Sequence, residues 1–355
     1  MTKQLTNLPD AMPGHTPGQT SGRTGHTSRA IVLRSQGDVH AQVEQLLVSD
    51  LPRQGDTLVR IRYSSLNYKD GLAVTGKGKI VRGEYPFVPG IDFVGEVVES
   101  ASDELAAGAW VIGTGSRIGE SFWGGFSQYQ WAKADWLVAV PDSLDPWRAM
   151  VAGTAGLTAM LSVRAIGRGG RRPADGPVLV TGATGGVGSL AVAFLSRRGY
   201  DVVASSGKAD EGAYLHELGA AEIIPRSDLS RGAAQPLDTS RWSGAIDSVG
   251  GTTLEAILSA VKTHGVVASC GLVGGAAFST TVFPFILRGV SLVGIDSNTC
   301  PMAERLAAWT DIGELLDEGL AGEIAHVHSL GDVVSLSEDI TAGRIRGRAV
   351  IDVNA

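Results

Sequence analysis

Three glycines supply the spacing in this chain that is best suited to chemistry. Gly182, Gly185 and Gly188 follow an apolar run at 178–180, and apolar or small residues recur at helical spacing from 187 to 195. Such a turn lets a backbone approach a diphosphate, and the helix N-terminus that follows supplies N–H groups and a positive dipole end. The sequence predicts a dinucleotide site here; an ordinary glycine-rich strand–helix turn is the alternative.

The end of the next expected strand indicates which dinucleotide binds. Sites for NAD carry an Asp or Glu about 20 residues after the glycines, where it accepts hydrogen bonds from the ribose 2′-OH. This chain has no carboxylate there, but Ser205, Ser206, Gly207 and Lys208. Hydroxyl groups and a cation suit a 2′-phosphate, and Arg226, just after the third strand, offers a second cation. We therefore expect NADPH; for Arg226 alone, an ordinary surface arginine is the alternative.

Strand and helix patterns alternate in the second half of the chain. Strands are expected at 178–180, 201–205, 221–224, 245–250, 265–269 and 290–295. Six strands separated by helices predict a doubly wound parallel sheet of the Rossmann type with right-handed crossovers, which we place at 151–299. Ligands bind at the carboxyl ends of such strands, so Leu272 and Ser297 are candidate contacts for the nicotinamide.

The first half of the chain is β-rich. Short strands are expected at 30–33, 45–48, 57–63, 109–113 and 136–141, with glycine and proline between them, which indicates a barrel-like domain. A β-like segment at 349–353 suggests that the chain returns to this domain, so we assign it 29–150 and 300–355. Residues 1–28 are rich in Gly, Pro, Thr, Ser and His, and we expect a disordered tail.

Composition limits the partners. The net charge is −7 and charged residues make up 19%, which does not favour nucleic acid. No stretch approaches the roughly 18 consecutive apolar residues of a membrane helix, so we expect no membrane partner. The chain has two cysteines, Cys270 and Cys300, and thus no disulfide framework, which fits a reducing cytoplasm.

Several blocks of residues resemble a known family. The segment 181–188 with Ser206-Gly207-Lys208 resembles the medium-chain dehydrogenase/reductase superfamily. Further blocks resemble its NADPH-dependent acrylyl-CoA reductase and quinone oxidoreductase subgroup; they are 64–70, 75–80, 89–93, 153–160 and 284–288. The resemblance runs from about Arg29 to the C-terminus. It implies a GroES-like catalytic domain beside a Rossmann domain, usually in a homodimer.

The positions that match zinc ligands of related enzymes hold other residue types. Zinc-dependent members place a cysteine where Asn67 stands and His-Glu where this chain has Ile91-Asp92. Their third ligand falls near Gly153-Thr154. A catalytic zinc needs three converging N, S or O donors, so we expect no metal in this chain.

What remains is hydride transfer from NADPH to an electron-poor double bond, which needs donors for the developing enolate and a proton source. The resemblance suggests that Asn67, Tyr68 and Asp70 lie at this site: Asn67 or Tyr68 as a donor to the carbonyl oxygen, and Tyr68 or water as the proton source. The alternative is that Asn67 and Asp70 cap the helix that follows. The residues expected to contact the cofactor are Tyr68, Thr184, Gly185, Gly186, Val187, Gly188, Ser205, Ser206, Gly207, Lys208, Arg226, Leu272, Ile286, Ser297 and Arg348.

Three functions stay open at this point. The first is reduction of a small enoyl-CoA, with acrylyl-CoA converted to propionyl-CoA. The second is reduction of a quinone or a free enone on the same fold. The third, of another class, is a nonenzymatic protein that binds NADPH and signals redox state. A loop with Lys77, Lys79 and Arg82 could meet CoA phosphates, but a solvated loop is the simpler interpretation.

Overall fold

The computed structural model describes residues 25–35 and 37–355. Most of the expected tail, residues 1–28, therefore lies outside the described residues. The first strand, β1, spans Thr27–Ser35 and begins two residues before the Arg29 at which the sequence pattern changes. Ser28 explains the difference, because its side chain is buried and its hydroxyl lies 3.0 Å from that of Ser127.

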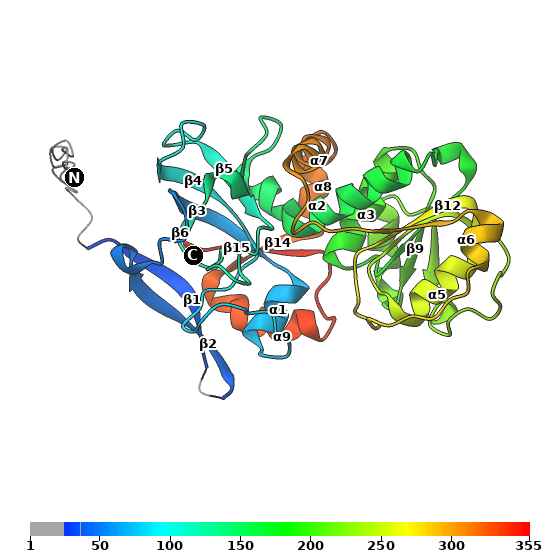
Figure 1. The fold of residues 1–355 in the computed structure, drawn as a ribbon, viewed down its shortest axis with the longest axis horizontal. Helices are drawn as coiled ribbons and strands as arrows, with labels where there is room; N and C mark the ends of the chain where they lie inside the picture. Colours follow the sequence, from blue (N-terminus) through cyan, green and yellow to red (C-terminus); the bar gives the residue numbers. More distant parts are fainter. Residues whose placement is uncertain (1–24, 36) are drawn as a thin grey trace, which may run out of the picture.

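A β-rich part occupies one end of the molecule (Figure 1). β1 pairs antiparallel with β2 (Val39–Leu47), and a second sheet has the order β14-β15-β3-β4-β5-β7, with β6 on β3. Its strands are β3 (Thr57–Leu66), β4 (Asp92–Ser100), β5 (Trp110–Thr114), β6 (Tyr129–Ala132), β7 (Leu137–Ala139), β14 (Ala325–Ser329) and β15 (Arg348–Asp352). The C-terminal strand β15 pairs antiparallel with β3 of this sheet.

Two helices cover this sheet next to the junction with the rest of the molecule. α1 (Tyr68–Val74) and α9 (Val333–Thr341) lie side by side in Figure 1. Apolar side chains of both helices join the core cluster of the sheet, including Val74 and Val333. α1 begins directly after β3, with Asn67 alone between the strand and the helix.

The second sheet is parallel throughout, with the order β10-β9-β8-β11-β12-β13. The sheet is therefore of the doubly wound type that the sequence predicts. The strands are β8 (Val178–Thr181), β9 (Val202–Ser206), β10 (Glu222–Pro225), β11 (Trp242–Asp247), β12 (Val261–Ser269) and β13 (Ser291–Gly294). The helices between them are α3 (Gly186–Arg197), α4 (Gly212–Glu217), α5 (Gly251–Ala260) and α6 (Phe283–Arg288). β11 and β12 begin earlier than expected, because Trp242 and Val261 are buried and extend the strands.

A long helix joins the two parts. α2 (Pro146–Arg168) packs against α3, against α7 (Met302–Leu315) and against strands of both sheets. Within the described residues, α2 alone is long and apolar enough to cross a membrane, but 89% of its most apolar window is buried inside the protein. Its composition is therefore accounted for by core packing. Because α7 packs on α2 while α8 (Glu318–Ile324) leads into β14, the segment 300–355 serves both parts.

Candidate cofactor and active site

Two positions of the glycine turn require glycine, one because of its φ and the other because a Cβ would collide with neighbouring backbone atoms. Gly182 has a φ of 58°, in the left-handed region. A Cβ on Gly188 would lie 2.2 Å from the carbonyl oxygen of Gly182 and 2.7 Å from the Cα of Ala183. Gly185 caps α3, whose first N–H groups have no partner within the helix and, with the dipole, favour an anion. The turn therefore fits a diphosphate.

The place of the turn in the sheet is the usual one for a dinucleotide. β9 and β10 lie on one side of β8, and β11, which follows in the chain, lies on its other side. The direction of winding thus changes between β8 and β11, and a crevice forms outside the carboxyl ends of the strands at such a point. The glycine turn follows β8 directly, so it lies at this crevice.

A cavity of about 530 Å³ at the ends of β9 and β10 gathers the residues expected to bind a 2′-phosphate. Ser206, Gly207, Lys208 and Arg226 all line it. The guanidinium of Arg226 lies so close to Gly207 that a Cβ there would be 3.1 Å from its central carbon. The Lys208 ammonium donates to the Ile345 carbonyl over 3.0 Å. Two cations and a hydroxyl thus face one cavity.

Ser205, by contrast, is buried in β9 and does not line this cavity. The sequence placed it with Ser206 because both end the same strand. Successive residues of a strand point to opposite faces, and of these two serines Ser206 is the one that lines the cavity.

A buried polar cluster lies where β3, β4 and β15 meet. Its members are Ser65, Asn67, Asp70, Asp92 and Arg348. Arg348 is 3% exposed and donates from Nη1 to Asn67 Oδ1 over 3.0 Å, from Nε to the Val151 carbonyl over 3.0 Å, and from Nη2 to the Ser65 hydroxyl. Its Nη2 lies 3.9 Å from Asp92 Oδ2. Burial lowers the pKa of Arg348, and the nearby carboxylates oppose that effect. The guanidinium of Arg348 thus links β15 to β3, to β4 and to α2.

The side-chain amide of Asn67 uses both its nitrogen and its oxygen in hydrogen bonds within the cluster. Its Nδ2 faces the Ser65 carbonyl, Asp70 Oδ2 and Asp92 Oδ2 at 3.2, 3.2 and 3.1 Å, and its Oδ1 accepts from Arg348. An amide has two hydrogens for these acceptors. In this geometry Asn67 therefore has no donor left for a substrate, and its role is to hold the cluster together.

Asp70 shows the capping arrangement that the sequence left open. Its Oδ2 accepts from the backbone N–H of Asn67 at 2.9 Å, just before α1, and its Oδ1 accepts from that of Ile91 at 2.9 Å. Burial and the nearby Asp92 raise the pKa of Asp70 to about 7, against the effect of these hydrogen bonds. The carboxyl group thus fixes the start of α1 and titrates near neutral pH.

Tyr68 is the remaining candidate donor. It is the first residue of α1 and is half-buried. Within the described part of the chain its hydroxyl forms no hydrogen bond. It therefore differs from Asn67, since its donor is available to a ligand.

The cluster touches the glycine turn. A Cβ on Gly186 would lie 2.9 Å from Cδ of Arg348, and the N–H of Gly347 donates to the Thr184 carbonyl over 2.9 Å. Arg348 therefore connects the predicted catalytic segment, through Asn67, to the predicted diphosphate turn. Val187, in the first turn of α3, lies in the same region and is partly buried.

α2 bends at the cluster. Gly153 has a φ of 50°, and a Cβ there would lie 2.6 Å from both Asp92 Oδ2 and the Ser65 hydroxyl. The next N–H, of Thr154, donates to Asp92 Oδ2 over 2.7 Å. The Thr154 hydroxyl is buried and has no hydrogen-bond partner among the described residues. A ligand atom at this point would supply the missing partner.

Three predicted contacts lie farther from the cluster. Ser297 follows β13, and its hydroxyl is 2.9 Å from that of Thr158 on α2. Leu272 follows β12 and is 62% exposed, while Ile286 lies on α6 and is 68% exposed. Ser297 is therefore connected to the helix that carries the cluster, whereas Leu272 and Ile286 present apolar surface outward.

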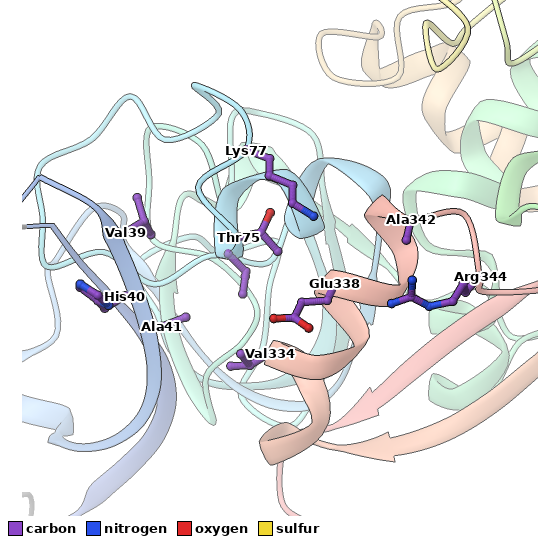
Figure 2. A pocket seen from close by; sticks show the side chains of 10 residues that line it. Val39, His40, Ala41, Thr75, Lys77, Val334, Glu338, Ala342 and Arg344 are labelled. Carbon is purple, nitrogen blue, oxygen red and sulfur yellow. The ribbon is translucent and has the colours of Figure 1, made fainter.

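A second cavity, of about 440 Å³, lies between β2, the end of α1 and α9 (Figure 2). Lys77 and Glu338 line it, and the Lys77 ammonium lies 3.1 Å from the Thr341 hydroxyl. Arg344 also lines it but pairs with Asp339. Because its walls carry charges of both signs, we do not assign this cavity to a phosphate.

The positions that match the zinc ligands are occupied by the polar cluster and by Ile91. Among residues 25–35 and 37–355, there is no group of three or more His, Cys, Asp or Glu side chains that could hold a metal ion. Ser65 and Asp92 are not among the site residues predicted from the sequence. The one signal in the sequence was a carboxylate directly before the apolar residues Phe93 and Val94.

A doubly wound parallel sheet with a diphosphate turn, joined to a β-rich domain by a buried polar cluster, defines a dinucleotide-dependent dehydrogenase or reductase. Comparisons agree. Residues 53–142 match the family model described as alcohol dehydrogenase GroES-like domain, and residues 186–312 match the one described as zinc-binding dehydrogenase.

Individual relatives are more specific. Acrylyl-CoA reductase AcuI of Ruegeria pomeroyi is 46% identical over 90% of this chain and 96% of its own. "Putative quinone oxidoreductase YhfP" of Bacillus subtilis is also 46% identical over the same shares, and its crystal structure has NAD bound. The structure of YhdH of E. coli K-12 with bound NADPH is 45% identical, with a TM-score of 0.89 over 92% of this chain and all of that one. The chain therefore belongs to the medium-chain dehydrogenase/reductase superfamily, in the subgroup of acrylyl-CoA reductases and related quinone oxidoreductases.

Proposed function

We propose that this protein uses NADPH to reduce the activated double bond of a small enoyl-CoA, with acrylyl-CoA converted to propionyl-CoA. The observation that carries the cofactor assignment is the cavity faced by Ser206, Lys208 and Arg226, beside a turn that fits a diphosphate. The similarity to AcuI, an acrylyl-CoA reductase, and to NADPH-bound YhdH supports the substrate and the cofactor.

Residues of the chain hold the cofactor in two places. The N-terminus of α3 receives the diphosphate, and Lys208 and Arg226 neutralise the 2′-phosphate. Within the cavity the Ser206 hydroxyl accepts from the Lys208 N–H over 3.0 Å, so its own hydrogen is free to donate. When bound, NADPH supplies a hydride.

The reaction needs one proton besides that hydride. Attack at the β-carbon moves the electron pair of the double bond onto the thioester oxygen as an enolate, and protonation of the α-carbon completes the saturated thioester. We assign the Tyr68 hydroxyl as donor to this oxygen, because it is available whereas the Asn67 amide is not. Arg348 and Asn67 hold the end of β3, from which Tyr68 starts α1. The proton for the α-carbon comes from Tyr68 or from water.

The direct test is oxidation of NADPH by the purified protein with acrylyl-CoA. Turnover with this thioester, faster than with crotonyl-CoA, methyl vinyl ketone or 1,4-benzoquinone, is the expected result. No turnover with acrylyl-CoA at millimolar concentration would contradict the proposal.

A second candidate function is reduction of a quinone or a free enone. The equal identity to YhfP favours it. The same substrate panel separates the two, because this function predicts faster turnover with the quinone or the ketone than with the thioester. NADH run side by side shows whether the cavity at Lys208 and Arg226 selects for the phosphate.

We also propose that the protein is a cytoplasmic homodimer. β13 is an edge strand, and next to it α6 exposes Ile286 and Leu287 by 68% and 61%. An uncovered sheet edge beside exposed apolar side chains is suited to pairing with a second copy. Light scattering that gives the mass of a monomer would contradict the dimer.

A further inference from the structure

Arg305 is a buried arginine that the proposed reaction does not use. It lies on α7 and is 3% exposed. Within the described part of the chain, no carboxylate forms an ion pair with it. Burial lowers the pKa of Arg305. Burying a guanidinium without a paired carboxylate costs free energy of desolvation. The hydrogen-bond partners of Arg305 therefore indicate its role.

All its partners are backbone carbonyls and one hydroxyl. Nη1 donates to the carbonyl and the hydroxyl of Thr114 over 2.9 and 2.8 Å, and Nη2 donates to the carbonyls of Ser297 and Asn298 over 2.9 and 3.2 Å. Thr114 ends β5 of the first sheet, and Ser297 follows β13 of the second. One side chain therefore joins the carboxyl ends of strands from the two sheets.

The loop after β5 is fixed at the same place in a strained shape. Gly115, Ser116 and Arg117 have φ values of 73°, 51° and 61°, three left-handed residues in a row. The N–H groups of Ser116 and Arg117 donate to the carbonyl and the side-chain oxygen of Asn298, both over 3.0 Å. Such backbone persists only where its surroundings hold it, and it is common at ligand sites.

The segment held in this way lies on the nicotinamide side of the crevice. The cavity expected to take the 2′-phosphate lies at β9 and β10, so the other half of a bound dinucleotide would extend over β11 to β13. Ser297 follows β13, and its hydroxyl is 2.9 Å from that of Thr158. One turn earlier on α2, Thr154 donates to Asp92 of the polar cluster. Ser297 is thus connected to the substrate side through α2 and to β5 through Arg305.

We propose that Arg305 is a positioning residue, which fixes Ser297 and the backbone beside it against β5 so that the nicotinamide is held at the polar cluster. The proposal rests on the function proposed above. Arg305 itself touches neither substrate nor cofactor; it acts through Ser297. Without it, we expect the nicotinamide half of NADPH to bind loosely while the adenosine half binds as before.

The experiment compares two ligands on the full-length protein. Titration calorimetry with NADPH reports both halves of the site, and 2′,5′-ADP reports the adenosine half alone. In Arg305→Gln, we expect Kd for NADPH to rise roughly tenfold, equivalent to about 1.4 kcal/mol, while Kd for 2′,5′-ADP stays at the wild-type value. Arg305→Lys keeps a charge and some donors, so it should fall between.

Arg164→Gln is the matched control, because it removes an ion pair between α2 and Asp311 of α7 without touching Ser297. It should leave both dissociation constants unchanged. Equal weakening of both ligands in Arg305→Gln, or no change in either, would overturn the inference. If Arg305→Gln does not fold, Arg305→Lys is judged by the same ratio. Failure of the wild type to bind NADPH would contradict the proposed function itself, whereas wild-type binding with an unchanged ratio in the variants contradicts only this inference.

Discussion

At the scale of single residues, the polar cluster contains two carboxylates and one guanidinium, and its charges do not balance. Asp70, Asp92 and Arg348 are 1%, 0% and 3% exposed. With all three ionised, the cluster would carry one uncompensated negative charge in a poorly solvated place. The raised pKa of Asp70 follows from burial first and from the negative charge of Asp92 second. The protonation state of the site therefore changes near neutral pH.

This titration makes a stability prediction. The pKa of Asp70 is about 7 in the folded protein and about 3.9 in an unfolded chain, so the folded state holds the extra proton between these values. Its contribution to stability is full below about pH 4 and is lost as pH rises through 7. Compared with Asp70→Asn, the wild type should lose about 3 kcal/mol of unfolding free energy between pH 5 and pH 8.

Denaturant unfolding of both proteins at the two pH values measures this difference. Asp103→Asn, at an exposed position, is the control and should follow the wild type at both pH values. Parallel pH dependence of the wild type and Asp70→Asn would show that Asp70 is already ionised at pH 5.

The phosphate cavity makes a second prediction at this scale. Losing one charge-assisted contact to a phosphate costs about 1.5–3 kcal/mol. Lys208→Ala and Arg226→Ala should therefore each raise KM for NADPH roughly ten- to a hundredfold, with little change in KM for NADH. The preference for NADPH over NADH, measured as the ratio of kcat/KM, should fall accordingly. An equal loss with both cofactors would mean that these side chains do not meet the 2′-phosphate.

At the scale of elements, local patterns in the sequence predict β8, the glycine turn and α3, but they do not predict the polar cluster. The glycines and the helical spacing lie within about twenty residues, so β8, the turn and α3 could be predicted. The cluster depends on register across the sheet: β3 pairs Ser64 with Phe93 of β4 and Leu66 with Ala349 of β15. Distant segments meet only after these strands pair, so the sequence alone could not place Ser65, Asp92 and Arg348 together.

The turn itself can be tested by one methyl group. In Gly188→Ala, the added Cβ would meet the Gly182 carbonyl at 2.2 Å, so the backbone must shift. Overpacking of this kind costs about 1–3 kcal/mol, and we expect binding of NADPH to be lost or strongly weakened. In the control Gly167→Ala, at the end of α2, the Cβ meets nothing within 4 Å. That change should preserve binding and raise stability by about 0.4–1 kcal/mol. Normal NADPH affinity in Gly188→Ala would contradict the proposed diphosphate site.

At the scale of the whole molecule, α2 packs against strands of both sheets and α7 packs on α2 (Figure 1). Arg348 of the polar cluster contacts the glycine turn that follows β8 of the second sheet. The fold class could be predicted because alternating strands and helices permit few topologies. The role of the helices between the sheets could not, because α2 is apolar nearly all round and gives no sign of which elements it faces. The bend at Gly153, which brings Thr154 to Asp92, becomes meaningful only with both sheets in place.

The central claim is that NADPH gives its hydride to the β-carbon of an enoyl thioester at this junction. The most direct measurement is reduction of acrylyl-CoA with NADPH deuterated at C4, using each diastereomer, followed by mass spectrometry and NMR of the product. We predict that one diastereomer delivers a single deuterium to the β-carbon of propionyl-CoA, while the α-carbon takes its proton from solvent. Propionyl-CoA without deuterium from either diastereomer, or with deuterium at the α-carbon, would contradict the account.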